Sequence, residues 1–106
     1  PFEDVTITRI KEGSFNACNE ATIGELANNF FSNPKWEAIV ATDGLSYVNL
    51  TGGMTFDNAP VDALVQFTAP IQDYADFEIN AFELNEIPQN AFMITGLVNV
   101  MCEEGQ

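Results

Sequence analysis

The spacing of hydrophobic residues changes near residue 35, and this change predicts the order of helices and strands. Before it, the i, i+3, i+4, i+7, i+8 intervals of a helix with one buried face are occupied by Ile23, Leu26, Ala27, Phe30 and Phe31. Thr22 and Glu25 have the spacing of a capping box, so we expect this helix to begin there. Pro34 disfavours helical geometry at the residue before it, so we expect the helix to end at Asn33-Pro34.

After residue 35, apolar and polar residues alternate, which is the period of a strand with one buried face. The alternation predicts four strands, at residues 36–42, 47–57, 61–68 and 74–85. Asp43-Gly44 is a hairpin signal between the first two strands, and residues 58–60 are typical of a turn. Because the connections are short, we expect the strands to form an antiparallel meander.

Two interruptions of the alternation predict irregular strands. Gly52-Gly53 lies in the middle of the second strand, where it indicates a bulge or a sharp coil. In the last strand, Phe82 and Leu84 fall on the opposite parity from the apolar residues before them. A bulge near Ala81 would return both side chains to the core.

Both ends of the chain add an element. Residues 5–10 alternate and are rich in β-branched side chains, which predicts a short strand or an extended arm within residues 1–20. Residues 89–103 have helical periodicity, with an inward stripe of Ala91, Ile94, Leu97, Val98, Met101 and Cys102. The other side of this helix is apolar too, at Phe92, Met93, Gly96 and Val100. The helix is therefore either wrapped by neighbouring chain or presents a surface to a protein partner or a second copy.

These elements predict one α+β domain over residues 1–106. We expect a two-layer sandwich, in which a four-stranded antiparallel meander has one helix before it and one after it, packed on one face. Trp36 shares the inward parity and is interpreted as a core anchor, not a ligand platform. The open face would carry Tyr47, Asn49, Thr51, Asp62, Gln66, Thr68, Glu78 and Asn80. Of these, Tyr47, Asn49, Thr51 and Gln66 are candidates for contact with a partner.

The charge balance narrows the choice of partners. The chain has 106 residues, with 16 acidic and 3 basic side chains, no histidine and a formal net charge of −13. All three cations, Arg9, Lys11 and Lys35, precede residue 36. Nucleic acids and anionic lipid surfaces need cations to neutralise them, so both are excluded as partners. The acidic excess is read as solubilising a secreted domain, with adaptation to salt or docking on a basic protein as alternatives.

Most catalytic chemistry is also missing. Without histidine, neither Ser-His-Asp nor Cys-His catalysis is available, and a zinc site would have only two cysteines and carboxylates. Gly52-Gly53 is not followed by the residues of a phosphate-binding loop. The carboxylate groupings that remain are Asp73 with Asp76 and Glu78, and Asp57 with Asp62. We therefore expect no enzyme activity, no cofactor and no metal site.

The two cysteines indicate in which cellular compartment the protein is found. Cys18 precedes the first predicted helix and Cys102 ends the last one, so the two thiols are placed to meet. A bridge would close a loop of 84 residues, worth about 4 to 5 kcal/mol in the chain-entropy model, and would imply an oxidising compartment. The alternative is two separate buried thiols in a cytosolic protein. No apolar run approaches the length of a spanning helix, so we expect a soluble mature fragment, attached to a membrane only through a tether upstream of Pro1.

Several segments together resemble an uncharacterised small domain of bacterial exported or membrane-tethered proteins. They are Thr22-Ile-Gly-Glu25, Phe30-Phe31-Ser32-Asn33-Pro34-Lys35-Trp36, Asp43-Gly44, Leu50-Thr51-Gly52, Val65-Gln66-Phe67, Phe77-Glu78-Ile79 and Ile87-Pro88-Gln89. The resemblance covers nearly all of the chain after residue 20. It implies an extracytoplasmic location and no assigned activity. The arrangement of helices on one face of a sheet is more loosely similar to outer-membrane assembly lipoproteins and β-lactamase-inhibitory proteins. In this chain, however, one helix is expected before the strands in the sequence and one after them, instead of both before.

Taken with the doubly apolar helix, these features favour a non-catalytic bacterial domain, secreted or tethered to the envelope, that binds protein. Either the open sheet face or the second side of the C-terminal helix would contact a basic partner or a second copy of the chain. A carbohydrate-active fragment that uses two carboxylates, and a module that binds calcium or a small ligand, are the alternatives.

Overall fold

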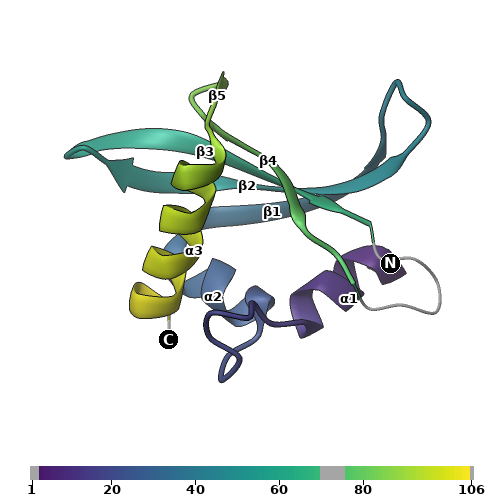
Figure 1. Ribbon diagram of the computed structural model, residues 1–106, viewed down its shortest axis with the longest axis horizontal. Coiled ribbons are helices and arrows are strands. Elements are labelled where there is room, and N and C mark those ends of the chain that lie inside the picture. Colours follow the sequence, from purple (N-terminus) through teal and green to yellow (C-terminus); the bar gives the residue numbers. More distant parts are fainter. Residues whose placement is uncertain (1–2, 70–75, 106) are drawn as a thin grey trace.

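The computed structural model describes residues 3–69 and 76–105. In chain order the elements are α1 (Val5–Glu12), α2 (Ile23–Phe30), β1 (Ser32–Val40), β2 (Ser46–Phe56), β3 (Ala59–Thr68), β4 (Ile79–Leu84), β5 (Ile87–Pro88) and α3 (Ala91–Glu104). The strands form one antiparallel sheet in sequence order, and the helices lie on one face of it (Figure 1). The predicted α+β fold with an antiparallel meander is confirmed, with one more helix and one more strand than expected.

The additional helix is α1, where the sequence predicts a strand or an extended arm. Asp4 caps its first turn, because the Asp4 carboxylate accepts a hydrogen bond of 2.8 Å from the backbone N–H of Thr6. Ile7 and Ile10 lie three residues apart, so the helical conformation buries both side chains in the core. This burial and the cap outweigh the β propensity of the threonines and isoleucines around them.

Helix α2 has the predicted capping box. The Thr22 hydroxyl accepts from the Glu25 N–H at 3.2 Å, and the Glu25 carboxylate accepts from the Thr22 N–H at 2.9 Å. The helix ends at Phe30, earlier than predicted, and β1 already includes Asn33 and Pro34. Asn33 has a φ of +49°, which helps the chain turn from helix into strand.

The glycine pair in β2 has a different role from the predicted one. Gly52 and Gly53 pair in unbroken register with β3, so β2 has no bulge on that side. The irregularity lies in β1, between Ser32 and Lys35. A Cβ on Gly52 would lie only 2.7 Å from the Cβ of Phe31. The glycines therefore allow the irregular start of β1 to approach β2 closely.

The last long strand is shorter than predicted, but its bulge is confirmed. Residues 74–75 of the predicted strand lie outside the described residues, residues 76–78 are not in a strand, and β4 begins at Ile79. Ala81 pairs with Gln66 and Ile79 pairs with Phe67, so Asn80 is the extra residue. Phe82 and Leu84 are buried as a result.

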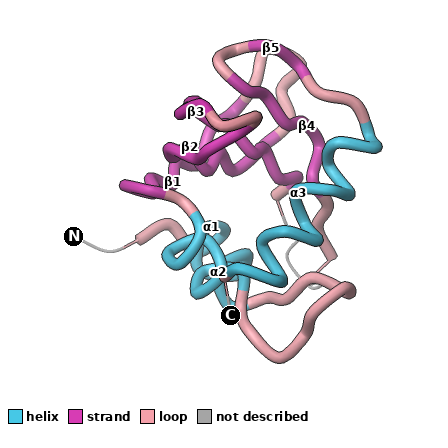
Figure 2. Tube along the Cα trace, turned by 90° about the vertical axis from the view of Figure 1, so that its left-hand side faces the viewer, coloured by secondary structure: helices cyan, strands magenta, loops and turns pink. Residues whose placement is uncertain are grey.

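Figure 2 shows the sheet and the helices from the side. The buried hydrophobic residues of both layers form one core cluster. Phe67 is fully buried at its centre, with the Trp36 ring stacked at 6.0 Å and the Phe77 ring edge-on at 6.0 Å. Lys11 of α1 places its Nζ 5.6 Å from the centre of the Trp36 ring. The prediction of Trp36 as a core anchor is confirmed, with the side chain half-buried.

In the part of β1 that follows Trp36, the side chains on the inward face are not buried. Ala38 is exposed and Val40 is 72% exposed, although both share the face of Trp36. Figure 1 shows the reason: the β1–β2 hairpin extends past α1, on the side of the molecule opposite α3, where no described helix covers it. Alternation indicates which side chains share a face, but burial also requires a second layer.

Candidate binding groove

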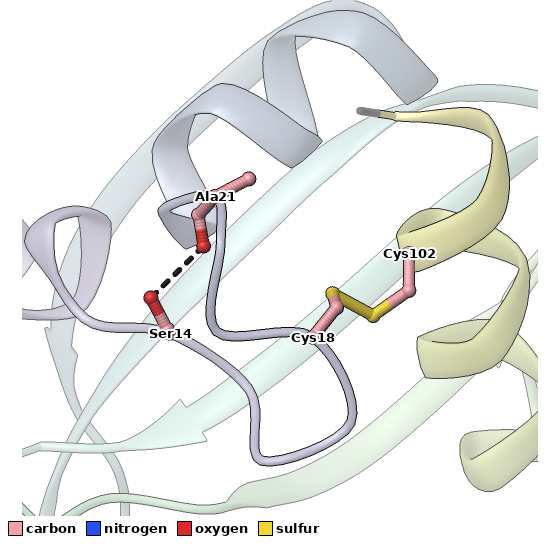
Figure 3. The surroundings of a disulfide bond; sticks show 4 residues. All are labelled: Ser14, Cys18, Ala21 and Cys102. Carbon is pink, nitrogen blue, oxygen red and sulfur yellow. Dashed lines mark hydrogen bonds between the residues drawn. A yellow bond between two sulfur atoms is a disulfide. The ribbon is translucent and has the colours of Figure 1, made fainter.

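Helix α3 frames the candidate site, and its C-terminal end is fixed to the rest of the chain by a disulfide. Cys102 in its last turn is bonded to Cys18, with the two Cα atoms 5.8 Å apart, so the predicted bridge is present. Cys18 lies in the loop between α1 and α2, which is closed by a 2.9 Å hydrogen bond from the Ser14 hydroxyl to the Ala21 carbonyl (Figure 3). The bridge therefore joins α3 to both N-terminal helices.

A second contact seats the same end of α3 on α2. The Asn29 amide of α2 donates a 2.6 Å hydrogen bond to the carbonyl of Gly105, the residue that follows α3. Gly105 is buried, and a Cβ there would lie 3.0 Å from the carbonyl oxygen of Leu26. From this fixed end, α3 runs back toward β5 (Figure 1).

The inward face of α3 largely follows the prediction. Leu97, Met101 and Cys102 are buried, and Ile94 and Val98 pack against the core as partly buried residues. Ala91 is exposed, contrary to the prediction, because it lies in the first turn, at the end of α3 farthest from α2. The first turn is capped by the Asn90 side chain, which accepts a 2.9 Å hydrogen bond from the Met93 N–H.

The second apolar side of α3 lines a groove of about 440 Å³. All four predicted partner-surface residues of the helix contribute to it: Phe92, Met93, Gly96 and Val100. Phe92, Gly96, Val100 and Glu104 follow at intervals of four and form one row along the helix. Phe92 is 83% exposed, the largest exposed fraction among the large hydrophobic residues of the described chain. Hereafter this cavity is called the α3 groove.

The opposite wall of the α3 groove comes from the sheet and α2. It consists of Phe30, Met54, Phe56 and Phe82, with a polar edge at Thr55 and Asp57, while Glu104 of α3 adds a carboxylate from the helix side. Phe56 is 42% exposed and precedes the β2–β3 turn, whose residues Asp57 and Asn58 both have positive φ. Alternation assigns Phe56, Met54 and Phe82 to the inner face, but only the tertiary structure shows that they face Phe92 across a groove.

The other candidate partner residues lie on the opposite face of the sheet, where Tyr47, Asn49 and Gln66 make hydrogen bonds to neighbouring side chains. The Gln66 amide donates to Asn49 Oδ1 at 3.0 Å, and the Asn80 amide donates to Gln66 Oε1 at 2.8 Å. These bonds form an amide ladder across β2, β3 and β4. The Tyr47 hydroxyl donates to Asp43 at 3.0 Å, and this contact raises the pKa of the Tyr47 phenol above its ordinary value.

Thr51 is exposed on the outer face, beside a polar hollow of about 460 Å³. Asp62 and Glu83 also line this hollow, whereas Asp57 lies on the α3 groove, so the structure does not place Asp57 and Asp62 at one cavity. The side chains at this hollow are polar or charged, apart from Ala63 and Leu64.

The other predicted carboxylate grouping is only partly visible. Asp76 and Glu78 line a hollow of about 380 Å³ between the loop after α1, β4 and α3, and Asp73 lies outside the described residues. Within residues 3–69 and 76–105, no three Cys, Asp or Glu side chains converge in a way that would hold a metal ion.

Comparison with protein-family models, curated proteins and solved structures found no match for this chain. None of the helices in the described ranges is long and apolar enough to cross a membrane. Functional inference therefore depends on the geometry of the chain itself.

Proposed function

We propose that this chain is a non-catalytic, extracytoplasmic protein-binding domain whose recognition site is the α3 groove. The observation that carries the proposal is the convergence of the exposed side of α3 with four apolar side chains from α2, β2 and β4 on one cavity. A groove of about 440 Å³ with apolar walls and a few polar edge groups has the size and character of a ligand site.

The α3 groove is a better recognition site than the outer sheet face. On the outer face, the Gln66 amide already donates to Asn49 Oδ1 and Gln66 Oε1 already accepts from Asn80, so a partner would have to compete with these hydrogen bonds. Phe92, in contrast, exposes a large aromatic surface to water, and aromatic side chains are enriched among the residues that carry binding energy.

The proposed location depends on the disulfide. Structural disulfides form and persist in oxidising compartments, and the Cys18–Cys102 bridge closes most of the chain into one loop. The same bridge fixes the helix that lines the groove. An extracytoplasmic location is therefore part of the proposal, in agreement with the resemblance to exported domains.

A defined peptide library tests the proposal. Phage-displayed random 12-residue peptides are selected on the immobilised domain, and the affinities of enriched peptides are measured by fluorescence anisotropy. We expect Phe92→Ser to weaken binding at least tenfold. Ile87→Ser is the matched control, because Ile87 is 63% exposed but does not line the groove. The proposal is wrong if no peptide is enriched over a blank surface, or if enriched peptides bind the Phe92→Ser variant as well as the wild type.

A further inference from the structure

Gly96 is at an unusual position for a glycine. It lies in the middle of α3, is exposed, and lines the α3 groove. A glycine inside a helix is destabilising relative to alanine, and one that persists usually has a packing reason. Here the free domain supplies no such reason, because a Cβ built on Gly96 would meet nothing within 4 Å among the described residues.

Acidic side chains at the end of α3 are a second unfavourable feature of the free domain. Glu103 and Glu104 lie in the last turn, where the helix dipole is already negative, and that turn has no basic residue. Glu104 and Asp57 both lie on the edge of the α3 groove. No lysine or arginine occurs anywhere in the chain after Lys35.

Gly96 and Glu104 lie in one row of the helix together with Phe92. Phe92, Gly96, Val100 and Glu104 succeed one another at intervals of four, so an exposed ring, a missing side chain, an apolar side chain and a carboxylate lie in line. The row is about 18 Å long, because twelve residues of helix rise 1.5 Å each. Each feature that destabilises the free domain would be favourable if a cationic helix lay along the row.

We infer that the occupant of the α3 groove is an amphipathic helix of about three turns, rich in lysine or arginine, that belongs to a partner protein. This inference rests on the proposed function. The apolar face of the occupant packs between Phe92 and Phe56, and its backbone approaches α3 most closely above Gly96. Its cations lie beside Glu104 and Asp57. A second copy of this chain is disfavoured as occupant, because each copy has a formal charge of −13.

The Gly96→Ala variant separates a binding role from a stability role. Because alanine is the better helix former and its methyl group meets open space, we expect the melting temperature to rise by about 4 °C. We expect the same variant to bind selected peptides at least tenfold more weakly. Thr95→Ala is the matched control, since Thr95 is exposed on the same helix and does not line the groove. It should also raise the melting temperature and change the dissociation constant less than twofold.

The enriched peptides and their salt dependence test the chemistry of the occupant. We expect net positive sequences with apolar residues at i, i+3, i+4 and i+7, whose affinity falls with added salt, and falls less steeply for Glu104→Gln. Groove-dependent peptides that are acidic, contain proline in their middle or ignore Gly96→Ala would overturn this inference and leave the proposed function intact. A dimer in sedimentation that Phe92→Ser dissociates would also overturn it. Failure to enrich any groove-dependent peptide would contradict both.

Discussion

At the scale of single residues, polar side chains beside backbone amides set the ends of the helices. Thr22 and Glu25 satisfy each other's backbone N–H groups at the start of α2. The side chains of Asp4 and Asn90 each accept one hydrogen bond from a first-turn N–H, of α1 and α3 respectively. The Glu25 carboxylate accepts hydrogen bonds from the Thr22 N–H and from the Thr22 hydroxyl, and both lower the pKa of the Glu25 carboxyl, the N–H more strongly. Each cap is therefore open to a substitution test.

For Thr22→Ala, we expect a loss of about 1 kcal/mol in the free energy of unfolding, because the Glu25 N–H then lacks its acceptor. Urea unfolding followed by far-UV circular dichroism measures the change. Thr22→Ser is the control and should retain most of the stability. An unchanged midpoint for Thr22→Ala would show that the capping box does not stabilise α2.

The capping box also predicts a pH dependence. Because the pKa of Glu25 is lowered in the folded state, its contribution to stability is present above the ordinary value of 4.5 and is lost as the pH falls through the folded-state pKa. We expect wild type to be more stable than Glu25→Gln at pH 6, with the difference shrinking towards pH 2.5. Urea midpoints across this range give the comparison. A difference that grows at low pH would contradict the assignment.

Tyr47 predicts a second titration, in the opposite direction. Asp43 accepts the phenol hydrogen and thereby raises the Tyr47 pKa. Absorbance at 295 nm, measured in a Tyr74→Phe background that leaves Tyr47 as the one tyrosine, should show ionisation above pH 10. Asp43→Asn should bring the pKa down. The same pKa in both variants would mean that the hydroxyl does not donate to Asp43 in solution.

At the scale of elements, the order of helices and strands after Thr22 was predictable, and the prediction was most accurate where local signals and burial agree. The start of α2 follows from the capping-box residues Thr22 and Glu25, and the strands β2 and β3 and the bulge at Asn80 follow from the alternation of apolar and polar side chains. Helix α1 was missed because the β-branched residues of 5–10 suggest a strand, while Asp4 and the core contacts of Ile7 and Ile10 decide for a helix. Tertiary contacts of this kind cannot be recognised from the spacing of hydrophobic residues in the sequence.

The candidate site was predictable only in part, for the same reason. The apolar second side of α3 is visible in the sequence, and all four of its residues line the groove. The opposite wall requires Phe56, at the end of a hairpin, to lie across from a helix that begins 35 residues later. The alternation along a strand predicts on which face of the sheet a side chain lies. It does not predict which helix or strand packs against that face.

The disulfide joins α3 to the loop between α1 and α2. Its removal should lower the stability of the domain and increase the local opening of α3 in particular. For the Cys18→Ser, Cys102→Ser double variant, we expect a loss of about 4 kcal/mol in the free energy of unfolding, because the unfolded chain is released from an 84-residue loop. Hydrogen exchange should rise most in α3, whose last turn is fixed by the bridge. Unchanged protection of α3 would contradict its anchoring role.

At the scale of the whole molecule, charge should oppose folding and favour association with a basic partner. A formal net charge of −13 on 106 residues destabilises the compact state by self-repulsion at neutral pH. Salt screens that repulsion, and it screens the attraction to a cationic partner as well. The stability of the free domain and the affinity of the proposed complex should therefore respond to salt in opposite directions.

We expect the melting temperature of the free domain to rise by several degrees between 20 mM and 500 mM NaCl at pH 7, because screening relieves the repulsion among carboxylates. Differential scanning calorimetry of the free domain provides the measurement. A melting temperature that falls with salt would mean that attractive pairs, such as Lys11 with Glu3, outweigh the net repulsion.

The most direct test of the α3 groove is the location of a bound peptide. Amide chemical shifts of the isotope-labelled, disulfide-bonded domain are followed while a selected peptide is added. If the groove is the recognition site, the largest shifts occur at Phe56, Phe92, Gly96 and Val100, on both walls of the cavity. Shifts concentrated at Asn49 and Gln66, on the opposite face of the sheet, would contradict the account.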